Sequence, residues 1–400
     1  MDSQENLQVE DPSSRPKHVV VVLLDSLNRH LLGAYGGREF TTPNLDRFAE
    51  KSVVFENHHT GSLPCMPARH DLLVGALDFP WRPWGSVEIW EDAITFALRQ
   101  AGVTTMLVSD HPHLFECGGE NYHIDFDAWE YVRGHENDPW KTRPDPSWVG
   151  TPALPVDEPR RGHFKYQDSR TWFKSEEDFP GPQTMQAAVR WVITNAGHHE
   201  RSLLVIDEFD PHEPFDTPEP WASKYRAHEE DPWMIWPPYV IDGLKNGLIT
   251  EEEGRSLRAA YGAKLSMIDH WFGKLLDAID ASPDADETAV IICTDHGHYL
   301  GEFDVWGKPG FPIHNTLGHI PMMIRWPGIE PRREQALTTT VDIHATLCDI
   351  YEISVDHRTH GRSLVPLVKQ KVSGVRDHCL SGYWGREVQL VTQDYTYTRG

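Results

Sequence analysis

The sequence has few cysteines, no long hydrophobic run and no apolar leader at its start. Its five cysteines are odd in number and widely spaced, so they do not indicate a disulfide framework. The first apolar run, residues 19–24, is far shorter than the roughly 20 residues of a membrane helix. The preceding residues are polar and unlike a secretion signal. We therefore expect a cytoplasmic protein with no membrane partner.

Basic residues are also scarce. The chain has 37 Lys and Arg against 61 Asp and Glu, which gives a formal net charge of −24. Such a charge argues against nucleic acid as a partner. It would also repel an anionic substrate at long range. A site for sulfate or phosphate would therefore need its own positive groups, which act within a Debye length of about 8 Å at physiological salt.

The chain does have the pattern of an open α/β sheet. Buried apolar runs alternate with amphipathic segments, and polar residues follow several runs directly, which places them at the carboxyl ends of strands where ligands bind. Asp25, His212 and Asp295 occupy such positions. We expect strands over 18–24, 53–55, 103–108, 203–206, 289–293 and 320–325, and helices over 43–51, 67–75, 92–101, 184–195, 250–279 and 341–351.

The remaining stretches have little periodicity. Residues 116–182 predict a long insertion of loops over the sheet, and a second irregular stretch reaches residue 248. The Trp- and Pro-rich segments 81–90 and 221–239 either pack as ordered loops or form walls of a substrate pocket. Residues 380–400 predict a hairpin. We expect a catalytic domain over 1–370 and, from 371–400, the start of a smaller C-terminal subdomain that is truncated here.

The segment LPCMPAR, residues 63–69, carries the strongest chemical signal. Cys65 stands where a helix is predicted to begin, with Pro67 two residues on and Arg69 one turn along. A helix N-terminus favours negative charge, and the arginine adds to this effect. By itself the pattern also fits an ordinary buried thiol.

With five further motifs, this segment resembles the sulfatase family. The motifs are D at 25 after the first strand, GAYG at 33–36, TPNLD at 42–46, DHG at 295–297 and IPMMIRWPG at 320–328. The resemblance spans nearly the whole chain. It implies an alkaline phosphatase-like fold, in which helices flank a large mixed sheet and a smaller antiparallel sheet lies at the C-terminus.

The resemblance also implies a nucleophile and a metal site. A formylglycine-generating enzyme would convert Cys65 to formylglycine, whose hydrate attacks sulfur. Residue 65 together with Asp25, Asp295 and His296 would hold one divalent metal, Ca²⁺ first, with Mn²⁺ or Zn²⁺ as alternatives. Most sulfatases have a second aspartate where this chain has Ser26. Phosphonate monoester and phosphodiester hydrolases lack it too, which leaves the metal and the substrate class open.

Three further residues gain roles from the resemblance. Lys308 stands where the family has a lysine that binds sulfate oxygens. His212, in DPHEP at 210–214, matches the histidine that contacts the ester oxygen and acts as general acid. Arg69 would support the nucleophile and its charge.

Another pair of family positions can be assigned in two ways. Aligning HPH at 111–113 with the family's K-x-H segment puts His111 in the lysine position and His113 in the histidine position. A count without gaps from Gly102 puts Asp110 in the lysine position instead. We favour the two histidines.

The sequence thus supports three hypotheses. The first is hydrolysis of a small or carbohydrate-type sulfate ester. The second is phosphonate monoester or phosphodiester hydrolysis at the same site. The third is a non-catalytic binding protein that retains Cys65 as a thiol. The oligomeric state is left open.

Overall fold

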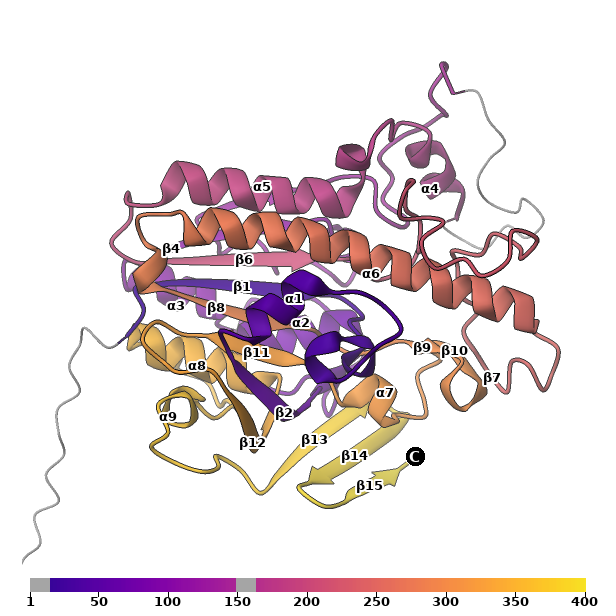
Figure 1. Ribbon diagram of the computed structural model, residues 1–400. Helices are drawn as coiled ribbons and strands as arrows, with labels where there is room; N and C mark the ends of the chain where they lie inside the picture. The colour runs from indigo at the N-terminus through magenta and orange to yellow at the C-terminus, as the bar shows by residue number, and fades with distance from the viewer. Residues whose placement is uncertain (1–14, 149–162) are drawn as a thin grey trace, which may run out of the picture.

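Strand β1 (His18–Leu24) lies in the middle of a mixed eight-stranded sheet (Figure 1). The computed structural model describes residues 15–148 and 163–400, and within them the strand order is β12-β2-β11-β8-β1-β6-β4-β5. Strand β11 runs antiparallel to its neighbours β8 and β2, whereas the other adjacent pairs are parallel. The other strands are β2 (Val53–His59), β4 (Thr104–Ser109), β5 (Ala128–Tyr131), β6 (Ser202–Glu208), β8 (Thr288–Cys293), β11 (Met322–Arg325) and β12 (Arg332–Thr339).

Helices cover both faces of this sheet. On one face α5 (Pro180–Asn195) and α6 (Glu251–Asp280) lie side by side, with α1 (Pro43–Ala49) beside them (Figure 1). The opposite face packs against α2 (Cys65–Val74), α3 (Ile94–Gln100), α8 (Val341–Tyr351) and α9 (Val365–Val368). Successive residues of β1 enter the two cores in alternation, so the whole strand is buried. This double burial explains why its sequence is continuously apolar.

Local signals in the sequence set the ends of the principal helices. Helix α6 starts after Thr250, whose side chain accepts a hydrogen bond from the Glu253 N–H while the Glu253 side chain accepts one from the Thr250 N–H. Helix α2 ends at Gly75, which has a φ of 75°. A residue with a Cβ is disfavoured in that conformation, so glycine terminates the helix there.

A smaller sheet contains both the C-terminal strands and the segment that precedes Cys65. Its order is β15-β14-β13-β3, in which β3 (Ser62–Leu63) pairs parallel with β13 (His378–Tyr383). Strands β14 (Glu387–Thr392) and β15 (Thr396–Arg399) extend it in antiparallel fashion. The sheet therefore reaches the start of the active-site helix α2, although its strands come mainly from the end of the chain.

The remaining elements are short. A three-stranded sheet has the order β7-β10-β9, with β7 (Val240–Ile241), β9 (Tyr299–Leu300) and β10 (Val305–Gly307). The short helices are α4 (His163–Arg170), α7 (Asn315–Gly318) and the 3-10 turns η2 (Arg29–Leu31), η3 (Gly33–Tyr35), η4 (Pro112–Phe115), η5 (Glu176–Asp178), η6 (Ala285–Glu287) and η7 (Glu302–Asp304). No helix in the described ranges has the length and apolar character to span a bilayer.

The structure confirms the α/β class, the large mixed sheet and the small C-terminal sheet. The prediction that residues 116–182 are all loops is wrong, because this stretch contains β5, α4 and the start of α5. Strand β5 lies at the sheet edge with its side chains mostly exposed, so no hydrophobic alternation marks it in the sequence. Residues 149–162 of this stretch, and the polar residues 1–14, lie outside the described residues.

Candidate active site

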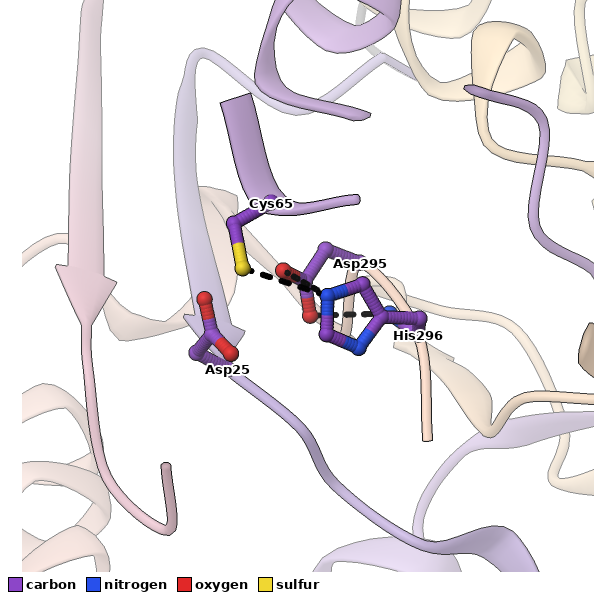
Figure 2. A group of neighbouring side chains, drawn as sticks. All are labelled: Asp25, Cys65, Asp295 and His296. Atoms are coloured by element: carbon purple, nitrogen blue, oxygen red, sulfur yellow. Dashed lines mark hydrogen bonds and ion pairs between the residues drawn. The ribbon is translucent and has the colours of Figure 1, made fainter. Parts of the chain in front are cut away.

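The candidate site forms where β1 and β8 end and α2 begins. Asp25 directly follows β1, Asp295 lies just beyond β8, and Cys65 is the first residue of α2 (Figure 2). Strands β1 and β8 are parallel neighbours, so their carboxyl ends bring the two aspartates together. One ligand atom each of Asp25, Cys65, Asp295 and His296 lies within 4.8 Å of the others, and all four residues are buried. These are the four residues that the sequence predicted as metal ligands.

Cys65 is surrounded by polar groups. Its Sγ lies 3.2 Å from His296 Nε2 and 3.7 Å from Lys308 Nζ. Burial and the nearby Asp25 carboxylate raise the pKa of the thiol well above its usual value. The thiol therefore remains protonated at neutral pH and is a poor nucleophile.

Arg69 binds three acidic side chains. Its Nε and Nη2 donate to Asp207 at 3.0 and 2.7 Å, its Nη2 lies 2.9 Å from Asp25 Oδ2, and its Nη1 donates to Asp295 Oδ2 at 2.9 Å. The Nη1 also donates to the backbone oxygen of Cys65 at 3.1 Å. Arg69 therefore supports the site mainly by compensating buried carboxylates, and it reaches residue 65 through the backbone.

The two aspartates fit a divalent cation. Asp25 Oδ2 accepts no hydrogen bond from the described residues, and it lies 2.9 Å from Arg69 Nη2 and 3.8 Å from His111 Nε2. Burial and the neighbouring Asp295 raise the pKa of Asp25, so this carboxylate would gain from a further positive charge. Two carboxylates, an imidazole and an oxygen on a converted residue 65 form a donor set suited to Ca²⁺, Mn²⁺ or Zn²⁺.

Ser26 occupies the position of the missing second aspartate. Its backbone has a φ of 63°, and its N–H donates to Asp295 Oδ1 at 3.1 Å. Its hydroxyl donates to Asp25 Oδ1 at 2.7 Å and lies 3.3 Å from Lys308 Nζ. Position 26 thus still faces the site, but it offers a hydroxyl in place of a carboxylate.

Lys308 and His212 both interact with the carboxylate of Glu213. Burial lowers the pKa of Lys308, but the surrounding Cys65 and Glu213 outweigh this and raise it, so the amine stays charged. His212 Nδ1 donates to the backbone oxygen of Glu213 at 2.8 Å. Burial and Lys308 hold the pKa of His212 well below its usual value. No residue in the described part of the chain bonds its Nε2.

The structure separates the three candidates for the disputed family positions. His111 Nε2 lies 3.8 Å from Asp25 Oδ2, and neither ring nitrogen has a hydrogen-bond partner among the described residues. Asp110 faces away, accepts a hydrogen bond from the Phe209 N–H at 2.8 Å, and has its pKa raised by burial and Asp210. Of these two residues, His111 is therefore the one that adjoins the metal ligands.

His113 packs behind His111, with 5.2 Å between the ring centres. Its Nδ1 lies 2.9 Å from Glu116 and its Nε2 3.2 Å from Glu136. Burial lowers the pKa of His113, but Glu136 and Glu116 outweigh this and raise it to about 9. His113 therefore contributes a positive charge, with both nitrogens directed at glutamates.

Four residues at the site were not predicted. Asp207 follows an apolar run in β6. An acidic residue at the end of such a buried run indicates a buried partner of opposite charge, and this signal could have identified Asp207 from the sequence. Glu213 lies next to the predicted His212, and His298 is two residues after His296. Tyr239 has no sequence signal, because it comes from an irregular loop.

Comparison with known proteins defines the class. The family model described as Sulfatase matches residues 17–353, so the chain belongs to the sulfatase family of hydrolases, within the alkaline phosphatase superfamily. The choline-sulfatase of Rhizobium meliloti (strain 1021) is 28% identical over 372 residues, which cover 88% of this chain and 71% of that protein. Human iduronate 2-sulfatase is 24% identical over 349 residues, covering 78% of this chain and 60% of that protein.

Solved structures share the fold. The phosphonate monoester hydrolase of Agrobacterium radiobacter has a TM-score of 0.72 at 19% identity, with 96% of this chain and 87% of that chain covered. A 2-O GAG sulfatase has a TM-score of 0.70 at 17% identity, with 96% and 82% covered. Sulfatases and a phosphonate monoester hydrolase therefore have the same architecture, and the fold alone does not distinguish these two substrate classes.

The metal assignment makes a direct prediction. Asp295→Asn should remain folded and lose bound divalent metal. The affinity of this variant for the divalent metal should fall by more than roughly 10–100-fold, which is the loss expected when a residue that only hydrogen-bonds a metal ligand is removed. Metal content after dialysis, measured by plasma mass spectrometry, checks this. Asp377→Asn is the control, because its side chain is 94% exposed and remote from the site. Full retention of metal by Asp295→Asn would contradict the assignment.

Proposed function

We propose that the protein hydrolyses an organic sulfate ester to an alcohol and sulfate, with residue 65 as the nucleophile after conversion to formylglycine. The observation that carries this proposal is the placement of Cys65. It lies at the first position of α2, 3.2 Å from His296 and 3.7 Å from Lys308, among the predicted metal ligands. A buried, protonated thiol has no evident task there, whereas a geminal diol at the same position would face a cationic pocket.

Local positive charge allows an anion to bind despite the net charge of −24. Lys308 is buried beside residue 65 and stays charged. A divalent metal held by Asp25, Asp295, His296 and residue 65 would polarise a non-bridging sulfate oxygen. Ca²⁺ is our first candidate, with Mn²⁺ or Zn²⁺ as alternatives.

The residues of the chain then have distinct tasks. One hydroxyl of the formylglycine hydrate loses its proton to water and attacks sulfur, the sulfur–oxygen ester bond breaks, and His212 gives the alcohol oxygen a proton. The second hydroxyl then loses its proton, the carbon–oxygen bond to sulfate breaks, and the aldehyde returns. Lys308 and His111 bind the sulfate oxygens, and His113 adds charge from behind His111. Arg69 holds the acidic residues in place.

The relatives support one class of substrate. Those named above include a choline-sulfatase, an iduronate 2-sulfatase and a 2-O GAG sulfatase. We propose a small or carbohydrate-type sulfate ester, and a formylglycine-generating enzyme as the partner in maturation.

A second candidate function is phosphonate monoester or phosphodiester hydrolysis. Ser26 in place of a second aspartate favours it, because the phosphonate monoester and phosphodiester hydrolases also lack that aspartate. The fold shared with a phosphonate monoester hydrolase is compatible with it.

The two candidates are separated by a substrate panel. The protein is first produced together with a formylglycine-generating enzyme, and the mass of the tryptic peptide over residues 52–69 shows whether Cys65 carries the aldehyde. We then expect kcat/KM to be higher for an aryl sulfate than for a phosphonate monoester or a phosphodiester. A sulfate rate far below the other two would overturn the sulfatase assignment. Unmodified Cys65 under these conditions would favour a binding protein or a thiol mechanism.

A further inference from the structure

The carboxylate of Glu213 lies at the centre of a buried polar group beside His212. Its Oε2 is 3.3 Å from His212 Nδ1 and 3.7 Å from His298 Nδ1. Its Oε1 accepts a hydrogen bond from the Tyr239 hydroxyl. Glu213 is only 4% exposed, whereas Tyr239 is 45% exposed, so the contacts with the two histidines are better shielded from solvent than the contact with the tyrosine.

His212 needs a nearby carboxylate in order to act as an acid. Its Nδ1 donates to the backbone oxygen of Glu213, so the neutral ring has its bare nitrogen at Nε2 and cannot donate from there. To protonate a leaving alcohol at Nε2, the ring must carry protons on both nitrogens. Burial and Lys308 both oppose that charge. The described part of the chain places no carboxylate other than Glu213 in an ion pair with His212.

Tyr239 brings the irregular stretch before β7 into this arrangement. Its ring packs against Gly307, where an added Cβ would lie 2.3 Å from Tyr239 Cδ1. Gly307 ends β10 and immediately precedes Lys308. The tyrosine therefore contacts the strand that delivers Lys308, while its hydroxyl holds the carboxylate that faces His212. Segment 221–239 thus contributes a residue to the site as well as packing.

We propose that Glu213, held by Tyr239, is a positioning residue that keeps His212 oriented and chargeable as the general acid. This inference rests on the proposed ester hydrolysis. It adds that the acid works as a histidine–carboxylate pair formed by two adjacent residues, and that the irregular segment 221–239 completes the pair.

The test compares leaving groups. Glu213→Gln removes the negative charge with little change of shape. An alkyl sulfate needs a proton on its leaving oxygen, whereas 4-nitrophenyl sulfate releases an already stable anion. We expect kcat for the alkyl sulfate to fall about 100-fold, the lower end of what general acid catalysis contributes, and kcat for the nitrophenyl ester to change less than about threefold. Tyr239→Phe should show the same selectivity with a smaller loss.

The pH profile provides a second readout. Activity that requires the charged form of His212 declines as pH rises through its pKa. Without the Glu213 carboxylate that pKa should be lower, so the alkaline limb for the alkyl sulfate should move to lower pH in Glu213→Gln. The other titratable groups that face His212 are Lys308, His298 and His135, and all three disfavour its charge.

The matched control for Glu213→Gln is Glu56→Gln, because Glu56 is also paired, with Arg29 and Arg333. The matched control for Tyr239→Phe is Tyr225→Phe, because the Tyr225 hydroxyl is also hydrogen-bonded, to Thr41 and Ser266. Both should leave the ratio of the two rates unchanged. An equal loss for both esters in Glu213→Gln, or an unmoved alkaline limb, would overturn the inference and leave the proposed function intact. Wild-type inactivity toward both sulfates would instead contradict sulfate hydrolysis. The same comparison would then be made with alkyl and 4-nitrophenyl phosphonate monoesters, where the same selectivity supports the inference.

Discussion

Cys65→Ala is expected to abolish hydrolysis, with kcat at least about 10⁴-fold below that of the matured wild type. Alanine cannot be converted to formylglycine, so the site retains its bases and acids without the atom that attacks. The fold should be unaffected, because the change removes one buried sulfur at the start of α2. Turnover of the best sulfate ester and a thermal melt, measured on the same preparation, check both statements.

A second cysteine provides the control for this result. Cys117 is exposed and lies outside the site, so Cys117→Ala should retain wild-type activity. Near-normal turnover by Cys65→Ala would show that the nucleophile has been wrongly assigned, whatever the peptide mass reveals about residue 65.

Arg69→Met should give the largest loss of stability. Arg69 is 3% exposed and contacts Asp25, Asp207 and Asp295, so its removal leaves three buried carboxylates without their common cation. Breaking one buried ion pair costs about 3–5 kcal/mol, and we expect the free energy of unfolding to fall by about that amount or more. Urea denaturation should be measured in the presence of a chelator, because a bound metal would itself compensate Asp25 and Asp295.

Arg82→Met is the matched control, since Arg82 also contacts several acids, Asp78, Glu88 and Glu91, but its side chain is 21% exposed. Its loss should cost less, because solvent replaces part of the lost interaction. Adding Asp207→Asn to Arg69→Met should recover part of the stability by removing one unpaired charge. Equal losses in the Arg69 and Arg82 variants would contradict the account of Arg69 as a buried counter-ion.

The position of Ser26 bears on the substrate question. With a hydroxyl in place of a carboxylate, the predicted ligand set carries two aspartates and one histidine, and Lys308 contacts the serine directly. The site is thus less negative than one with three carboxylates. The rate comparison between sulfate and phosphonate esters measures which of the two substrate classes this site prefers.

The sequence alone identified, through motifs that resemble those of sulfatases, the four residues that the structure brings together in one buried cluster. Asp25, Cys65, Asp295 and His296 belong to short motifs at strand ends and at a helix start. Each position is set by a few adjacent residues, so the pattern is readable along the chain. The alternation of buried strands and amphipathic helices likewise predicted an open α/β sheet, because burial on both faces demands continuous apolar strands, and the family resemblance added its mixed character.

The tertiary structure decided which residues complete the site. Arg69 meets Asp207 across 138 positions of sequence, and Tyr239 reaches Glu213 from a loop without periodicity. The structure also places His111 Nε2 3.8 Å from Asp25 Oδ2, whereas Asp110 accepts a hydrogen bond from the Phe209 N–H. Such contacts depend on how helix α2 and the long loops pack against the carboxyl ends of the strands. They are made between segments far apart in the chain, and no local pattern of residues specifies them.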